Sequence, residues 1–211
     1  MLSLRTFGLS AAIASLLAAP AAFAQDTGDT ASGKRFSIVG SATILQPDSV
    51  PVPGARAEAD GDVAPTLSAT YHITDNIGVE LWGAADKFNH RVRGDAGKLG
   101  TVDSQPIALS GQYHFGAADN TFRPFVGLGY HQTNISDEDI ATADGAHVGL
   151  TTPKGAIGTV GVDVNITPTW FARADARYLD GKADAKLAGQ TVERDVKFNP
   201  WTVGIGIGAR F

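Results

Sequence analysis

The chain has 211 residues, with 17 Lys and Arg against 22 Asp and Glu, no cysteine and a formal net charge of −5. This acidic balance argues against nucleic acid as a partner, and the lack of cysteine excludes a disulfide framework and thiolate chemistry. No linker-like stretch or abrupt change of composition divides the chain, which indicates one domain.

Residues 1–24 have the pattern of a secretory signal peptide. Arg5 lies in a short n-region, an apolar stretch follows from Leu9 to Leu17, and Ala22-Phe23-Ala24 forms a small-residue cleavage box before Gln25. Residues 25–211 then carry 16 basic and 22 acidic residues. No later run approaches the ~18 apolar residues of a membrane helix, which excludes a helical membrane protein and leaves a β-barrel open.

Eight later segments alternate apolar and small or polar residues with a period of two, which is typical of β-strands with two different faces. Residues 63–73 show it well, with Val63 and Tyr71 on one face and Ala64 and His72 on the other. The predicted strands are 36–46, 63–73, 77–86, 105–115, 122–132, 155–166, 170–179 and 200–211.

The connections between these segments alternate strictly between long and short. The four long ones have about 16, 18, 22 and 20 residues, and the three short ones have about 3, 6 and 3. The short ones carry turn residues: Thr74-Asp75-Asn76, Gly116 to Thr121, and Thr167-Pro168-Thr169. This pattern predicts an up-and-down antiparallel meander with both termini at the short-turn side.

The distribution of charge and aromatic residues decides which face points inward. Seven strand charges lie opposite the apolar face: Glu80, Arg123, Asp163, Arg173, Asp175, Arg177 and Arg210. The apolar face carries aromatics mostly near strand ends: Phe36, Tyr71, Tyr113, Phe115, Phe122, Tyr130, Trp170, Tyr178, Trp201 and Phe211. Aromatic girdles around an outward apolar band indicate an all-β, eight-stranded transmembrane barrel of outer-membrane type, with four long extracellular loops within residues 25–211.

Several ordered blocks resemble the outer membrane protein W (OmpW) family over most of residues 25–211. They are TDNIGVEL (74–81), FRPFVGLG (122–129), GVDV (161–164) with TW (169–170), RYLD (177–180), and NPW followed by GARF at the C-terminus. The alternating apolar residues Trp201, Val203, Ile205, Ile207 and Phe211 also resemble the signal read by the outer-membrane assembly machinery.

The resemblance implies a Gram-negative outer-membrane location, contact with the lipid bilayer and lipopolysaccharide, and passive uptake of small hydrophobic molecules that enter at the extracellular mouth and escape sideways into the membrane. It also implies a role in the envelope stress response. The chain departs from the family pattern in two places. Lys154 precedes Gly155 where some members have an aromatic residue, and a double proline is reduced to Pro106.

Strand direction divides the predicted interior into two halves as a tendency, to which Phe125, Phe171 and His131 are exceptions. The extracellular half receives an apolar set predicted to contact ligand: Leu45, Trp82, Ala84, Ala108, Ile157 and Leu179. The seven strand charges gather in the other half, where a structural ion-pair network or an ion-selective lining are both open readings. Such a layer would stop an apolar solute, which cannot replace its hydrogen bonds.

Two prolines are candidates for a lateral seam because each removes a ladder donor. They are Pro65 and Pro106, and the alternative is that they simply mark loosely paired strand ends.

Neither a catalytic nor a metal site is expected, and no cofactor is implied. The five histidines are scattered without metal-ligand spacing such as HExxH. Two functions remain: a channel for hydrophobic molecules, or a non-transporting anchor whose extracellular loops act as a receptor, adhesion or stress-response surface.

Overall fold

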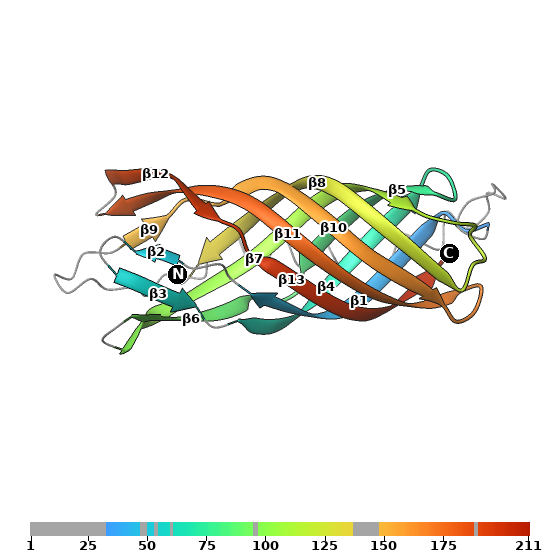
Figure 1. Cartoon of the computed structure of the whole chain (residues 1–211), viewed down its shortest axis with the longest axis horizontal. Coiled ribbons are helices and arrows are strands. Elements are labelled where there is room, and N and C mark those ends of the chain that lie inside the picture. The colour runs from blue at the N-terminus through green and yellow to red at the C-terminus, as the bar shows by residue number, and fades with distance from the viewer. Residues whose placement is uncertain are drawn as a thin grey trace, which may run out of the picture.

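The structure is a computed structural model that describes residues 33–46, 50–52, 55–59, 61–94, 97–136, 148–187 and 190–211 (Figure 1). The predicted signal peptide, residues 1–24, lies outside the described residues. Eight strands form the barrel: β1 (Phe36–Gln46), β4 (Asp62–His72), β5 (Ile77–Ala84), β7 (Gly97–His114), β8 (Phe122–Ser136), β10 (Lys154–Asn165), β11 (Trp170–Leu187) and β13 (Trp201–Arg210). Five shorter strands accompany them: β2 (Val50–Val52), β3 (Ala55–Ala59), β6 (Phe88–Gly94), β9 (Val148–Leu150) and β12 (Gln190–Phe198).

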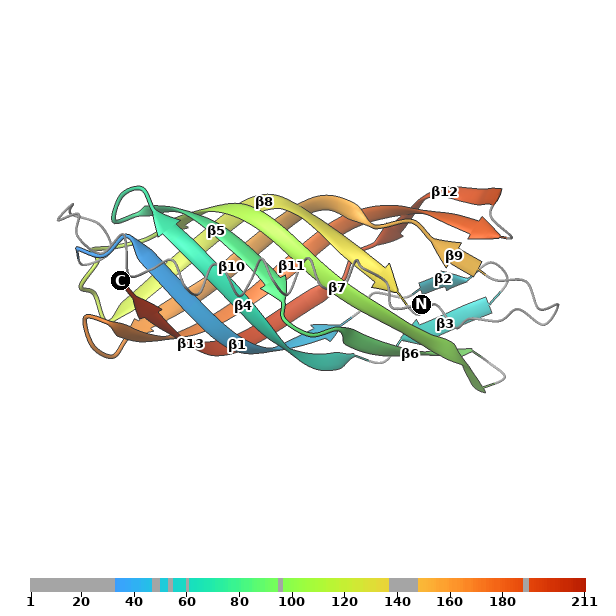
Figure 2. The ribbon, with the colours of Figure 1, turned by 180° about the vertical axis from the view of Figure 1, so that it is seen from behind.

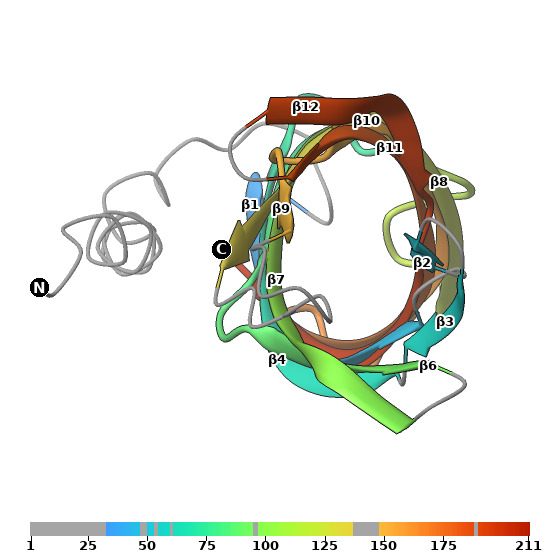
Figure 3. The same cartoon turned by 90° about the vertical axis from the view of Figure 1, so that its left-hand side faces the viewer.

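The barrel is closed, because the first and last strands pair with each other. Each of the eight strands pairs antiparallel with the next in the chain, and β1 pairs with β13 from Ser37↔Arg210 to Gln46↔Trp201. Seen from the front and from behind, the strands run obliquely around the long axis of the barrel (Figures 1 and 2). The view along that axis shows a ring (Figure 3). The predicted eight-stranded up-and-down barrel is therefore confirmed.

The five shorter strands gather at one end, called here the long-connection end, while the tight turns and the C-terminus lie at the other, the short-turn end (Figure 1). The predicted strands 105–115 and 170–179 are too short, because β7 begins at Gly97 and β11 continues to Leu187, each 18 residues long. These extensions pair with β6 and β12 as hairpins beyond the ring. Neither extension has the bulky apolar face by which the other strands were predicted, so the alternation did not reveal them.

Two of the tight turns are closed by the same device. Thr74 Oγ1 accepts hydrogen bonds from the backbone N–H groups of Asn76 and Ile77, at 3.3 and 3.0 Å. Thr167 Oγ1 accepts from Thr169 and Trp170 in the same way, at 3.2 and 2.9 Å. Each threonine hydroxyl thus accepts from two backbone N–H groups of the turn that have no partner in the strand pairing, which fixes the register of the strands on either side.

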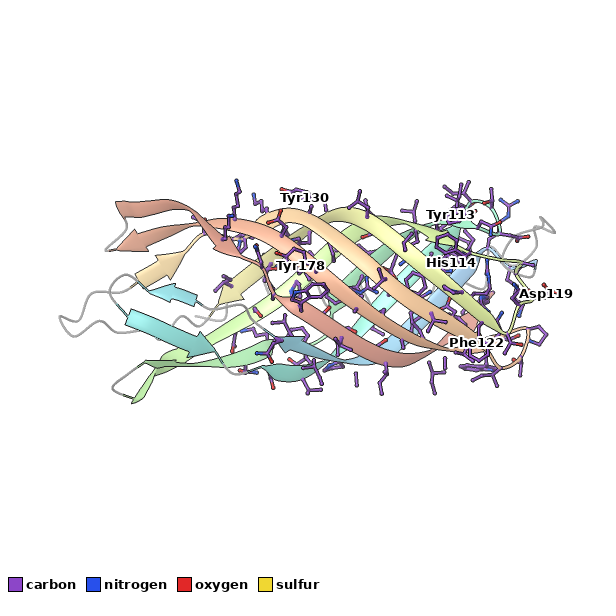
Figure 4. All side chains as sticks on the ribbon, in the orientation of Figure 1. Tyr113, His114, Asp119, Phe122, Tyr130 and Tyr178 are labelled. Atoms are coloured by element: carbon purple, nitrogen blue, oxygen red, sulfur yellow. The ribbon has the colours of Figure 1, made fainter. Side chains whose placement is uncertain are left out.

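The two faces of the strands differ as the alternation predicts. Along β13, Trp201, Val203, Ile205 and Ile207 are 52–68% exposed, whereas Thr202 is fully buried. Tyr130 and Tyr178 lie toward the long-connection end, and Tyr113 and Phe122 lie near the short-turn end (Figure 4). From Trp170 to Tyr178 the chain advances about 27 Å along β11, or about 20 Å along the axis at a typical ~40° tilt. The outer face thus has an apolar band of membrane dimensions between two aromatic belts. No helix among the described residues is long and apolar enough to cross a bilayer.

Candidate functional site in the barrel interior

The half of the interior toward the long-connection end holds two apolar clusters beside buried polar residues, which include Ser104, His131 and Thr133. Trp82, Ala108, Ile157 and Leu179 form one cluster, in which every member is at most 3% exposed. Leu45, Ala64, Ala84 and Phe88 form a second, at most 2% exposed. The six residues predicted to contact ligand are therefore all interior, but they divide between two clusters.

An ion-paired layer lies against the first cluster and crosses the barrel. Arg173 binds Asp163 through two donors, Nε to Oδ1 at 2.7 Å and Nη2 to Oδ2 at 2.9 Å. Its Nη1 reaches Glu80 Oε1 at 3.0 Å, and Arg177 Nη1 reaches Glu80 Oε2 at 2.6 Å. Glu80 is on β5 and both arginines are on β11, with three barrel strands between them in either direction. These bonds therefore connect opposite walls.

Of the remaining charges of the predicted network, Asp175 lies within this layer, and Arg123 and Arg210 extend it toward the short-turn end. Arg177 Nε binds Asp175 Oδ1 at 2.8 Å, and Arg210 lies 3.5 Å from Asp163 while donating to Asn165 Oδ1 at 2.6 Å. Arg123 donates to the backbone oxygen of Asp75 at 2.6 Å, which ties the wall to the 74–76 turn.

Aromatic rings pack against three of the guanidinium groups. Arg177 lies 4.7 Å from the ring centre of Trp82, Arg173 lies 4.5 Å from that of Phe125, and Arg210 lies 4.0 Å from that of Phe171. Cation–π contacts of this kind strengthen in a desolvated interior. The Trp82 contact also joins the apolar cluster to the charged layer.

The charged layer is densely filled. Glu80, Arg123, Asp163, Arg173, Arg177 and Arg210 are each at most 2% exposed, and Asp175 is 8% exposed. Side chains packed this closely leave little room for a water-filled path at this level. An apolar molecule passing along the axis would have to break these ion pairs without replacing them.

The wall of the barrel is interrupted at the end of β5. The β4–β5 ladder stops at Thr66↔Ala84 and the β5–β7 ladder stops at Gly83↔Ile107. Beyond this point β6 pairs with β3 and β7. Between β4 and β6 the Asn89 N–H donates to Asp62 Oδ2 at 2.7 Å.

Both prolines identified from the sequence face this interruption. The Pro65 oxygen accepts from the Ala85 N–H at 2.9 Å. The Pro65 nitrogen faces the same neighbouring segment, but it carries no hydrogen and cannot donate the second bond of the pair. Pro106 on β7 is the register partner of Thr133 on β8, and the Thr133 N–H donates to the Pro153 oxygen, away from β7. The backbone of Pro106 therefore also points away from its partner, so the Pro106 nitrogen faces β5. The Gln105 side chain donates to the Ala84 oxygen in its place, at 3.1 Å. Pro106 lies inside β7 rather than at its end.

Phe88 is a buried residue of this region that the sequence did not reveal. It is the first residue of β6, fully buried, and packs with Ala84 and Ala64 on the inner side of the interruption. Its signal is present but weak: an aromatic residue follows the predicted strand 77–86 after one intervening residue, within a stretch expected to be a loop.

A closed antiparallel barrel with an apolar outer face and two aromatic belts defines a β-barrel protein of outer-membrane type. Residues 35–211 match the OmpW family. Outer membrane protein W of Salmonella typhimurium is 33% identical over 221 residues, covering 99% of this chain and 100% of that protein. The Escherichia coli K12 protein of the same name is 34% identical over 194 residues, covering 85% and 89%. The chain belongs to the OmpW family, and its location is the outer membrane.

Solved structures agree. The crystal structure of OprG from Pseudomonas aeruginosa is similar with a TM-score of 0.69 and 29% identity, covering 88% of this chain and 98% of that one. The solution structure of E. coli outer membrane protein W gives 0.59 and 30%, covering 84% and 98%. The outer membrane protein AlkL shares the fold, with a TM-score of 0.63 at 19% identity, covering 84% and 90%.

Proposed function

We propose that this protein is a passive conduit for small hydrophobic molecules, which enter at the long-connection end and leave sideways into the bilayer. That end would be extracellular, because the longer loops of outer-membrane barrels face outward. Residues 1–24 would be the export signal, and Trp201, Val203, Ile205, Ile207 and Phe211 would form the signal for barrel assembly.

One observation carries the proposal: two apolar clusters lie between a closed ion-paired layer and an interruption in the wall. A hydrophobic solute can make apolar contacts with Leu45, Ile157 or Leu179 in place of the contacts these side chains make with each other. It cannot form hydrogen bonds with the arginines beyond them. Ala64, Ala84 and Phe88 line the inner side of the interruption, so movement of one aromatic side chain would connect the apolar interior to the lipid.

Replacing Ile157 by aspartate tests the apolar route. We expect uptake of an apolar fluorescent probe into vesicles to fall on the order of tenfold, because the carboxylate would be buried against Trp82 and Leu179 without a hydrogen-bond partner. Thr159→Asp is the matched control, since Thr159 is the next inward residue of β10 and is in register with Arg177. Its carboxylate would meet a guanidinium, so uptake should stay near wild type. A folded Ile157→Asp protein with unchanged uptake would contradict the proposal.

The lateral exit has its own reversible test. The chain has no cysteine, so a pair introduced at Asp62 and Asn89, which already contact each other between β4 and β6, can be closed and opened at will. Oxidation should lower uptake severalfold and a reductant should restore it. A pair at Val160 and Ala176, register partners on the far wall, should change nothing. Equal uptake by the oxidised and reduced Asp62/Asn89 pair would exclude this exit.

A second function is favoured by the hairpins that extend the barrel beyond the aromatic belt. The β6–β7 and β11–β12 pairs project there as paired strands and could present a receptor or adhesion surface. Under this reading, deletion of the hairpins would alter binding to cells while loss of the protein left probe uptake unchanged.

A further inference from the structure

Three lysines lie side by side across neighbouring strands on the outside of the barrel. Lys154 on β10 is the register partner of Lys182 on β11, which is in turn the register partner of Lys197 on β12. Directly paired residues of an antiparallel sheet point to the same face, with Cβ atoms about 5 Å apart. All three lysines are exposed. They are called the lysine row here.

Nothing in the described part of the chain neutralises the lysine row. None of its members has a hydrogen-bond or ion-pair partner among the described residues. Among the described side chains next to the row, Asp180, the preceding outward residue of β11, is acidic and exposed. Like charges placed directly opposite each other destabilise a sheet, so an anion across the row would remove an unfavourable interaction as well as add favourable ones.

The row lies just beyond the aromatic belt. On β11, Lys182 is four residues past Tyr178, and on β8 the partner of Lys154, Gln132, is two residues past Tyr130. Tyr130 and Tyr178 lie near one another in Figure 4, separated by β10, whose outward residues there are Ala156 and Gly158. A side chain added at Gly158 would meet open space. The surface beneath the lysines is therefore low between two rings, with small residues on β10 and the exposed Asp180, in register with Ala156, at its edge.

We infer that the lysine row binds the phosphate groups of lipopolysaccharide, with an acyl chain lying over Ala156 and Gly158. Lysine amines at the level of the headgroups are suited to phosphate, and the low surface of small residues below them fits a lipid better than a free ion. The assignment rests on the orientation given under the proposed function, with this end outward. Among the described side chains at the same end, the β4–β7 side carries Asp62, Asp86 and a Lys87–Asp103 ion pair at 3.3 Å in place of such a row.

Binding of labelled lipopolysaccharide to the folded, detergent-solubilised protein tests the site. Each of K154Q, K182Q and K197Q should weaken the apparent Kd about fivefold, and the triple variant on the order of 100-fold. The same lipid stripped of its phosphates should bind wild type and triple variant equally. Added salt should weaken wild-type binding, because exposed charges are screened. K182R should retain binding, and K87Q, which removes one positive charge from the opposite side, should match wild type.

Three results would overturn the inference: a triple variant that binds like wild type, an equal loss with the dephosphorylated lipid, or a loss in K87Q as large as in K182Q. Full competition by inorganic phosphate at the concentration of the lipid would instead assign the row to a free anion and overturn the lipid assignment. Folding of every variant is checked by the mobility shift between heated and unheated samples. The lysines lie outside the proposed transport route. Loss of probe uptake with lipopolysaccharide binding intact would therefore contradict the proposed function alone, and loss of binding with uptake intact would contradict this inference alone.

Discussion

Replacing Glu80 by glutamine is expected to lower the free energy of unfolding by about 3–5 kcal/mol, the range for breaking a buried ion pair from one side. Glu80 is fully buried and accepts from both Arg173 and Arg177. Glutamine keeps its shape but leaves two guanidinium groups without the carboxylate that joins them. Urea unfolding of the protein folded into lipid vesicles, followed by tryptophan fluorescence, measures the change.

Asp103→Asn is the matched control for this experiment. Its ion pair with Lys87 is partly exposed, with the lysine side chain 29% and the aspartate side chain 14% accessible. Pairs of this kind contribute about 0–1 kcal/mol. If Glu80→Gln were as mild as Asp103→Asn, the layer between β5 and β11 would not brace the barrel.

Arginine in place of Ile205 is expected to destabilise the folded barrel by about 2–4 kcal/mol, because a lipid-facing cation near the middle of the bilayer loses its hydration. Ile205 is 68% exposed and lies halfway along β13 between Trp201 and Ala209. The same unfolding assay in vesicles reports the effect.

The position-matched control is Ile73→Arg. Ile73 is 53% exposed and directly follows β4 at the short-turn end, where arginine should cost about 0–1 kcal/mol because it reaches the interface. Equal costs at the two positions would mean that the apolar outer face does not meet acyl chains.

Sequence reasoning succeeded where one local rule decides the outcome. The predicted strand 36–46 coincides with β1, and Glu80, Asp163 and Arg173 lie inside as the alternation requires, because a buried and a lipid-facing side leave a period-two signature. It left out Gly97–Ser104 of β7 and Asp180–Leu187 of β11. The first stretch does not alternate and the second alternates charged with mostly small residues, so neither has the bulky apolar face by which the other strands were predicted.

The contacts across the interior could not be predicted. Alternation puts Glu80 and Arg177 on the inner face, but whether they meet depends on the tilt and stagger of eight strands. The same holds for the proline pair. Pro65 and Pro106 were identifiable as missing donors, whereas their convergence on the end of β5 required knowing to which neighbour each residue directs its backbone.

The ion-paired layer between β5 and β11 also bears on how many copies of the protein a cell can tolerate. At this level the described side chains that cross the interior are interlocked guanidinium and carboxylate groups. Under the proposed function, each added barrel would therefore give apolar molecules an entrance from outside without giving ions an open path along its axis.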